Sequence, residues 1–305
     1  NRNMLIVFAA SNDGIDDDAD GVIDLDSIGA PGTAKNCLTV GAAESYRTSG
    51  GLSGYTWGNA WPSDYPANPV KNDYISRPDE PQGMAAFSSR GPCNDGRIKP
   101  DIVAPGTDIL SARSKATSDT GWGAFSGNTN YIFMGGTSMA TPLTSGAAGL
   151  VRQWLIQVAG ITDPSAALVK ALMMNGARNM APGQYGTGAT QEIPDSRPNN
   201  VEGWGHVDLY KTLSPSTELT LRLYDTNSLA TGESNQFTVA VAAPTTEKFT
   251  VTLAYSDYWA ASGAGKKLVN DLDLTIIKPL GSVVYANGST QLDSTNNVET
   301  IEFEA

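Results

Sequence analysis

The sequence has a single histidine, two cysteines and few basic residues for its length. Its 305 residues include 20 Lys and Arg against 32 Asp and Glu, giving a formal net charge of −12. Nucleic acids and anionic membrane surfaces bind clustered Lys and Arg, so we expect neither as a partner. No apolar run approaches the roughly 18 to 20 residues of a membrane span. The acidity is equally compatible with a role in solubility alone.

The two cysteines, Cys37 and Cys93, are not part of a CxxC pair, which argues against a zinc site. Two buried free thiols and one disulfide are the open alternatives. A disulfide would indicate an oxidising compartment.

Apolar runs and helical patterns alternate over the first two thirds of the chain. The runs at 4–10, 36–42 and 101–110 predict buried strands, and the patterns at 138–158 and 163–176 predict helices. In the second helix, Asp163 is the expected N-cap, Pro164 the first helical residue, and Asn175-Gly176 the end. Alternating strands and helices predict an α/β domain with a parallel sheet. The chain enters its first strand without a leading loop or signal peptide, so we expect it to be a fragment that lacks an N-terminal portion.

The pattern changes after residue 213. Segments such as "TELTLRLY", "NQFTVAVAAP" and "EKFTVTLAYSD" alternate polar and apolar residues between turn residues, as in antiparallel sandwiches. We therefore predict two domains, 1–213 and 214–305. Residues 46–82, between the strands of the first domain, are rich in Gly, Pro and aromatics. This composition predicts a compact surface loop packed by its own aromatic side chains. The alternative is a lip over a binding cleft.

The segment "YIFMGGTSMATPLTSGAAGL" places Ser138 in a turn of small residues directly before a helix. Small neighbours allow backbone to approach the hydroxyl, and a helix N-terminus offers unpaired N–H groups to an oxyanion. Ala140 stands where the lipase elbow G-x-S-x-G has its last Gly, so an α/β-hydrolase is disfavoured. Packing alone also explains such a turn, and the single histidine, His206, lies far downstream.

This segment resembles the nucleophile signature of the subtilisin-like serine peptidases. "FAASNDG", "SIGAPGTAKNCLTVGA", "FSSRGP" and "DGRIKPDIVAPGTDILS" resemble the family's other blocks in the same order, and "GWGHVDL" with "LVNDLDLTI" resembles its alkaline members that carry a C-terminal β-sandwich. The resemblance implies an α/β fold: the C-terminal part of a subtilisin-like parallel-sheet domain, followed by a truncated, jelly-roll-like antiparallel β-sandwich. It also implies a secreted, extracellular endopeptidase acting on polypeptide substrates.

Carried over by position, Ser138 is the expected nucleophile, and Asn12 the side-chain donor to the oxyanion. The expected walls of the substrate pocket are Ala9, Ala10 and Ser11 on one side and Ala30, Pro31 and Gly32 on the other. Ser11 stands where the family often has Gly, a departure that narrows the pocket.

The family's catalytic Asp and His blocks precede the strand that begins this sequence, and neither is present. His206 follows the catalytic helices and is expected to be structural. In subtilisin, loss of Ser or His costs on the order of 10⁶-fold in turnover, and the oxyanion hole retains only about 10³ to 10⁴ over water. We therefore expect the chain alone to be inactive without the missing N-terminal part, supplied by the same chain or a nicked partner. The alternative is a non-catalytic relative that binds a surface or partner through its β-sandwich.

An acidic loop predicts a structural Ca²⁺ site. "DGIDDDADGVIDLDS" places Asp16, Asp18, Asp20 and Asp24 at the spacing of a D-x-D-x-D-G-x-x-D loop, with Gly21 at the turn and Val22 offering its carbonyl. A solvated acidic loop is the alternative. A weaker second candidate comprises Asp257, Asp271 and Asp273. The resemblance further implies that Cys37 and Cys93 lie on adjacent segments and form a disulfide.

Overall fold

The structure is a computed structural model that describes residues 3–77, 82–214, 219–225, 228–241 and 248–304. Its contacts divide the chain into two compact units, which we describe separately. The sheet unit comprises residues 6–147 and 178–207. The helix–hairpin unit comprises the described parts of residues 1–5, 148–177 and 208–305. These spatial units differ from the domains 1–213 and 214–305, which stay a prediction.

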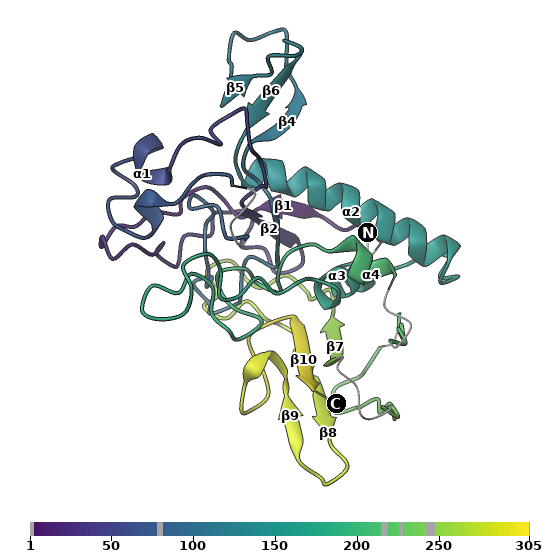
Figure 1. Ribbon diagram of the computed structural model, residues 1–305. Helices are drawn as coiled ribbons and strands as arrows, with labels where there is room; N and C mark the ends of the chain where they lie inside the picture. The colour runs from purple at the N-terminus through teal and green to yellow at the C-terminus, as the bar shows by residue number, and fades with distance from the viewer. Residues whose placement is uncertain (1–2, 78–81, 215–218, 226–227, 242–247, 305) are drawn as a thin grey trace. The chain divides into compact units, whose positions relative to one another are not determined.

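The centre of the sheet unit is a parallel sheet of order β1-β2-β3 (Figure 1). Its strands are β1 (Val7–Ala9), β2 (Leu38–Ala43) and β3 (Ile102–Pro105). Val7 pairs with Leu38, and Val40 pairs with Ile102. All six residues of β2 are buried, as expected for a central parallel strand covered on both faces. The strands predicted at 4–10 and 36–42 are therefore confirmed in position, and the first part of the run at 101–110 forms β3.

A second, antiparallel sheet of order β4-β6-β5 leads into the nucleophile turn (Figure 1). Its strands are β4 (Ile109–Ala112), β5 (Gly123–Ala124) and β6 (Tyr131–Met134). The run predicted as one strand at 101–110 is thus divided between β3 and β4. The segment 46–82 contributes only the short helix α1 (Trp57–Ala60), capped by the Thr56 side chain, and the 3₁₀ turn η1 (Val70–Asn72).

The helices predicted at 138–158 and 163–176 are present as α2 (Thr137–Gln157) and α3 (Ala166–Asn175). The predicted N-cap of α3 was wrong. Ser165 caps the helix, because its hydroxyl accepts from the Leu168 N–H at 3.0 Å. Asp163 lies outside the helix and pairs with Arg152 at 3.5 Å. A short helix, α4 (Leu209–Leu213), follows the return of the chain from the sheet unit.

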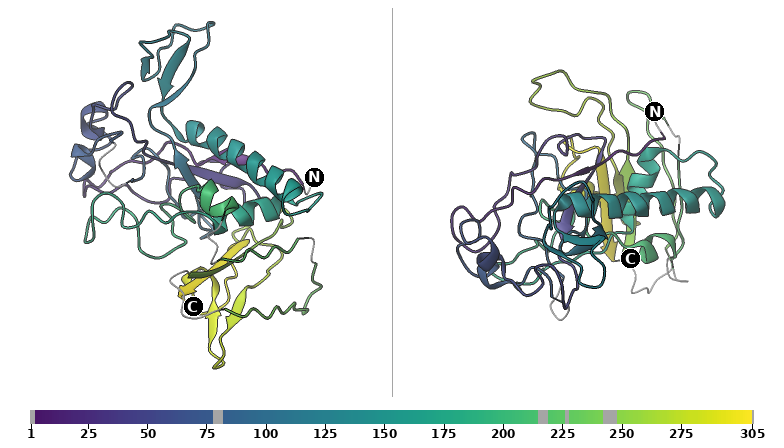
Figure 2. Two further views of the ribbon diagram at one scale, coloured as in Figure 1. Left: turned by 45° about the vertical axis from the view of Figure 1, so that its right-hand side comes forward. Right: turned by 90° about the horizontal axis from the view of Figure 1, so that it is seen from above.

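The C-terminal segment forms two antiparallel strand pairs (Figure 2). The first pair is β7 (Lys248–Ala254) with β10 (Val298–Glu304), and the second is β8 (Thr275–Ile277) with β9 (Val283–Tyr285); the 3₁₀ turn η2 (Ala286–Gly288) follows β9. Strands were also predicted for "TELTLRLY" and "NQFTVAVAAP", but the described residues of these two segments form none. The β-sandwich therefore stays a prediction, of which two antiparallel pairs are present.

No helix among the described residues has the length and apolar character needed to cross a membrane.

Candidate active site

The nucleophile turn joins β6 to α2. Gly136 adopts a φ of 144°, a backbone conformation that other residues rarely adopt, and its N–H donates to the Gly106 carbonyl at 2.8 Å. Ser138 follows as the second residue of α2, and its side chain is exposed. The N–H groups of this first helical turn have no intrahelical acceptor. Here the Met139 and Ala140 N–H groups donate to the Gly136 carbonyl, and among the described residues the Ser138 N–H has no acceptor. The turn thus presents a hydroxyl next to one unpaired backbone donor.

Asn12 lies directly against this turn. The Thr137 N–H and the Thr137 hydroxyl both donate to Asn12 Oδ1, at 2.8 and 2.9 Å. Because both contacts use the amide oxygen, the amide nitrogen is left to donate elsewhere. The structure therefore brings Asn12 and the nucleophile segment together across 125 residues of sequence and fixes which end of the amide is the donor.

The two predicted walls of the substrate pocket also come together. The Gly29 N–H donates to the Ala10 carbonyl at 2.9 Å, and Gly32 lies against the Ala9 carbonyl oxygen. Ser11 has a φ of 99° and donates its hydroxyl to the Asp13 carboxylate. Segments 9–11 and 29–32 are thus adjacent, and the six predicted pocket residues lie on them.

No described side chain accepts a hydrogen bond from the Ser138 hydroxyl. His206 lies in the sheet unit, where its backbone bridges Val103 and Arg178. Its Nδ1 is 2.9 Å from the Val207 carbonyl oxygen, so it is the donating nitrogen, and Nε2 is 3.0 Å from Gln82 Nε2. Both ring nitrogens therefore have structural partners.

The predicted calcium loop brings three of its four carboxylates together. Asp16, Asp18 and Asp20 each place a carboxylate oxygen within 4.8 Å of the others. Asp24 is used differently, because its Oδ2 accepts from the Asp17 N–H at 2.7 Å. Asp16 is buried, which raises the pKa of its carboxyl, and it accepts from the Gly21 N–H. Three hard oxygen donors at this spacing suit Ca²⁺.

The second acidic candidate does not form such a group. Asp257 closes its own loop, accepting from the Val269 and Asn270 N–H groups at 2.8 and 2.9 Å. Within the described residues, Asp16, Asp18 and Asp20 form the one group of acidic, His or Cys side chains close enough to share an ion.

The disulfide prediction was wrong, since Cys37 and Cys93 are buried free thiols. The Cys37 thiol turns into its own loop and donates to the Ala34 carbonyl at 3.0 Å. Burial raises the pKa of the Cys93 thiol.

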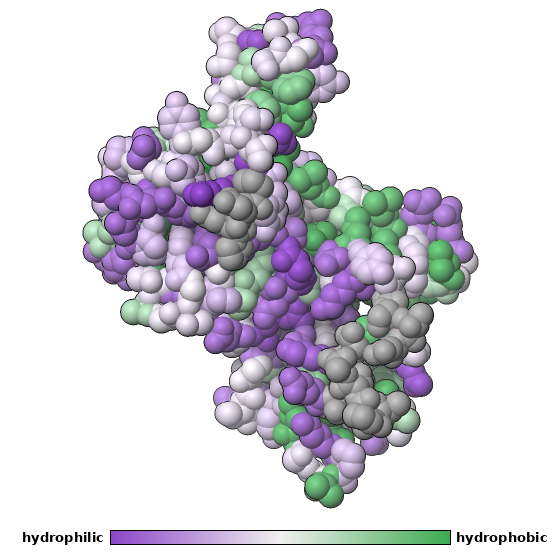
Figure 3. Space-filling view, viewed as in Figure 1, coloured by the Kyte–Doolittle hydropathy of each residue, from purple (hydrophilic) through white to green (hydrophobic). Residues whose placement is uncertain are grey.

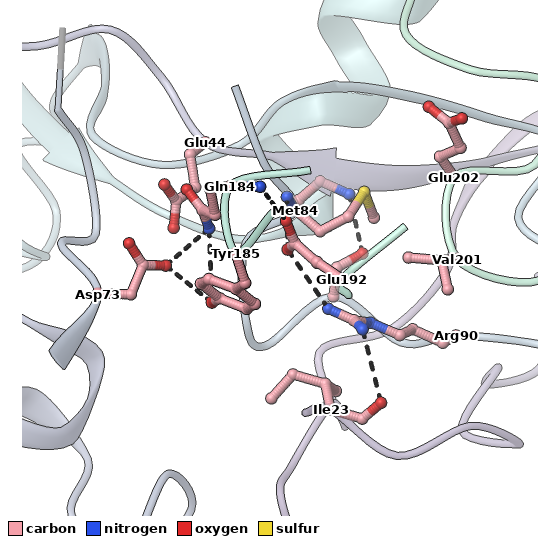
Figure 4. A network of polar contacts seen from close by, with 12 residues as sticks. Ile23, Glu44, Asp73, Met84, Arg90, Gln184, Tyr185, Glu192, Val201 and Glu202 are labelled. Atoms are coloured by element: carbon pink, nitrogen blue, oxygen red, sulfur yellow. Dashed lines mark hydrogen bonds and ion pairs between the residues drawn. The ribbon is translucent and has the colours of Figure 1, made fainter. Parts of the chain in front are cut away.

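The sheet unit also contains a buried polar network that sequence reasoning missed (Figure 4). Glu44, Asp73 and Glu192 are all buried, and the buried Arg90 is 3.7 Å from Glu192. Asp73 accepts from Tyr185 and Gln184, at 2.9 and 2.6 Å. Burial, reinforced by Asp73 and Glu192, raises the pKa of Glu44 well above its ordinary range. Asp73 and Gln184 are 111 residues apart in the sequence, so no local pattern could have grouped these residues.

Sequence comparison agrees with this geometry. A model of the subtilase family matches residues 1–205, which is more than half of the chain, so the chain belongs to the subtilase family. It is 30% identical over 88% of its length to a "Serine protease/ABC transporter B family protein tagD" of Dictyostelium discoideum, of which it covers 17%.

Two further relatives were compared. The chain is 32% identical over 61% of its length to "Serine protease AprX" of Bacillus subtilis, covering 34% of that protein. The solved structure of the prenylagaramide maturation protease PagA is 20% identical to this chain. The match covers 69% of this chain and 50% of the PagA chain, with a TM-score of 0.39. The chain thus spans about a third or less of the curated relatives named here.

Proposed function

We propose that the chain supplies the nucleophile and the oxyanion hole of a serine endopeptidase. The observation that carries this proposal is the pair of hydrogen bonds from Thr137 to Asn12 Oδ1, which leaves the Asn12 amide nitrogen, next to Gly136 of the nucleophile turn, free to donate. A packing role for the turn does not require an amide held in this orientation.

In this reaction Ser138 Oγ attacks the carbonyl carbon of the scissile peptide bond. The carbonyl oxygen becomes an oxyanion, which the Ser138 N–H and Asn12 Nδ2 stabilise. Collapse of the intermediate releases the amine and leaves an acyl group on Ser138 Oγ, which water then removes. Adjacent segments 9–11 and 29–32, with their small residues, hold the substrate side chain next to the attacked bond.

The hydroxyl proton needs an acceptor, because a neutral serine is a weak nucleophile. The partner in this proposal is the rest of the catalytic domain, which carries the Asp and His and is either a further part of the same chain or a nicked fragment. Among the described residues, strand β1 is an edge of the parallel sheet; Ile6, just before it, and Phe8, within it, are 52% and 37% exposed. Figure 3 shows apolar side chains over helix α2, where Leu143, Leu150 and Ile156 are exposed. An open strand edge with exposed apolar residues favours pairing with a further strand.

Hydrolysis of a denatured protein substrate tests this proposal. The chain alone should not cleave it, whereas the chain with the companion segment should. Ser138→Ala should abolish cleavage, and Ser145→Ala is the matched control, because Ser145 is exposed on the same helix and donates only to the Thr141 carbonyl. Equal cleavage by the Ser138→Ala variant would contradict the proposal.

The proposal includes a structural calcium ion and an extracellular location. Asp16, Asp18 and Asp20 hold the ion, and the Val22 carbonyl and Asp24 are the further expected ligands. The grouping of three carboxylates supports this site. Extracellular calcium concentrations suit a loop with few charged ligands.

A non-catalytic binding role through the C-terminal segment is the second candidate. It is favoured by an exposed aromatic pair, Tyr258 and Trp259, whose rings stack at 4.0 Å while Trp259 is 75% exposed. A complete protein that binds a partner through this pair, yet leaves Ser138 unreactive, would support this second role.

A further inference from the structure

The nucleophile turn depends on outside contacts for its rigidity. Gly135 and Gly136 stand next to each other before Thr137, and two adjacent glycines leave the backbone more freedom than any other pair of residues. On one side, Gly106 and Asn12 hold the turn through the hydrogen bonds described above. The direction of the Ser138 hydroxyl therefore depends on what holds Gly135.

Trp122 fills the space beside Gly135. A Cβ atom at Gly135 would lie 1.8 Å from Trp122 Cη2 and 2.1 Å from Cζ2, so the indole ring occupies the volume of a side chain there. The backbone N–H of Trp122 donates to the carbonyl of Phe133, in strand β6, at 2.8 Å, which fixes Trp122 to the strand that leads into the turn. The ring thus covers the first glycine of the turn.

Trp122 is in turn packed against the segment 46–82. Its ring centroid lies 5.8 Å from that of Trp61 and 6.2 Å from that of Phe87. Trp61 stacks on Trp57 at 5.7 Å, and the buried Trp57 donates its indole N–H to Glu44 at 2.7 Å. Trp57, Trp61 and Tyr65 also contact one another, as predicted for a loop packed by its own aromatics. The aromatic segment is therefore joined to the nucleophile turn through a continuous set of ring contacts.

We propose that Trp61, acting through Trp122, is a positioning residue that holds the Gly135–Gly136 turn so that Ser138 Oγ points at the substrate carbonyl. This inference rests on the proposed peptidase function. Misplacing a reacting group by about 1 Å can cost about 10²-fold in rate. The pocket segments 9–11 and 29–32 are held together by their own contacts, so loss of Trp61 should affect turnover and not substrate binding.

The first test is Trp61→Ala in the complete protein, with the companion segment present. We expect kcat to fall by about ten- to a hundredfold, with KM unchanged, and Trp61→Phe to restore most of the loss. Tyr55→Ala is the control, because Tyr55 belongs to the same segment but is exposed. A rise in KM with kcat unchanged would overturn the proposal, since it would make the aromatics a substrate-contacting surface.

A double-mutant cycle tests the contact between Trp122 and Gly135 and does not need the Trp61→Ala variant to fold. Gly135→Ala should sharply lower kcat because the new methyl group collides with Trp122. The same change should cost little in a Trp122→Leu background, where that ring is absent. Equal losses in the two backgrounds would refute the positioning contact.

Amide hydrogen exchange separates this inference from the proposed function. Trp61→Ala should speed exchange of the Gly136 and Thr137 amides, whether or not the protein is active. Unchanged exchange would contradict the proposal that Trp61 holds the turn. An inactive wild type in which the substitution still speeds exchange would contradict the peptidase function and support the restraint on the turn.

Discussion

Glu202 is a buried carboxyl whose ionisation should destabilise the fold as the pH rises. It is completely inaccessible to solvent; Oε2 accepts from the Met180 N–H at 3.0 Å, and Oε1 has no partner among the described residues. Burial raises the pKa of Glu202 to about 7, against the opposing influence of Met180, Arg197 and Arg178. The ordinary pKa is 4.5. In the unfolded chain, Glu202 therefore loses its proton at a lower pH than in the folded chain.

The sign of the effect follows from proton counting. Between pH 4.5 and about 7 the folded state holds a proton that the unfolded state has lost, so the free energy of unfolding falls as pH rises. At about 1.36 kcal/mol per pKa unit, the full penalty above pH 7 is on the order of 3 kcal/mol. Below pH 4.5 the penalty is absent.

The substitution Glu202→Gln tests this magnitude, since glutamine keeps an acceptor for Met180 but does not ionise. Urea unfolding at about pH 4 and pH 8 should show that the variant gains about 3 kcal/mol relative to wild type between the two conditions. Glu233→Gln, at an exposed glutamate, is the control and should show no such gain. A Glu202→Gln effect that is the same at both pH values would refute the reasoning.

Two other variants probe the remaining parts of the site. Replacing Asp18 and Asp20 by Asn should lower the melting temperature in calcium but not in chelator, because the lost carboxylates act through the ion; equal decreases in both would contradict a metal site. Replacing Asn12 by Leu in the complete protein should leave KM nearly unchanged and lower kcat by about 10² to 10³, since the amide acts mainly on the oxyanion; a loss confined to KM would show that Asn12 binds substrate instead.

Local sequence signals predicted the elements that carry the nucleophile. The small residues of "GGTSMA" followed by an apolar helical pattern predicted a helix, which is present as α2, whereas the strand before the turn, β6, was not predicted. Family blocks placed Asn12 beside this turn, although its hydrogen bonds to Thr137 depend on a contact across 125 residues. The sequence was less informative where two residues could make the same interaction. Asp163 and Ser165 are both good N-caps for α3, but Ser165 caps the helix and Asp163 pairs with Arg152.

Long-range polar contacts were beyond sequence reasoning. Glu44, Asp73 and Glu192 lie in segments with unrelated local patterns, and only the fold brings them close to one another and places Arg90 beside Glu192. The contact between the Trp122 ring and Gly135 is also long-range, and nothing in the local sequence "TGWGAF" indicates which residue the tryptophan packs against. The alternating segments near 219–225 and 235–241 predicted strands, but alternation alone does not supply the pairing partner that a strand requires.

The reactivity of Ser138 toward a fluorophosphonate tests the central claim most directly. The adduct should be located by mass spectrometry of the digested protein, with and without the companion segment. We expect a single labelled peptide, containing Ser138, that forms rapidly only with the companion present, because only then does the hydroxyl have a base. Rapid labelling of the isolated chain, or a complete protein that carries the Asp and His blocks and leaves Ser138 unlabelled, would contradict the claim.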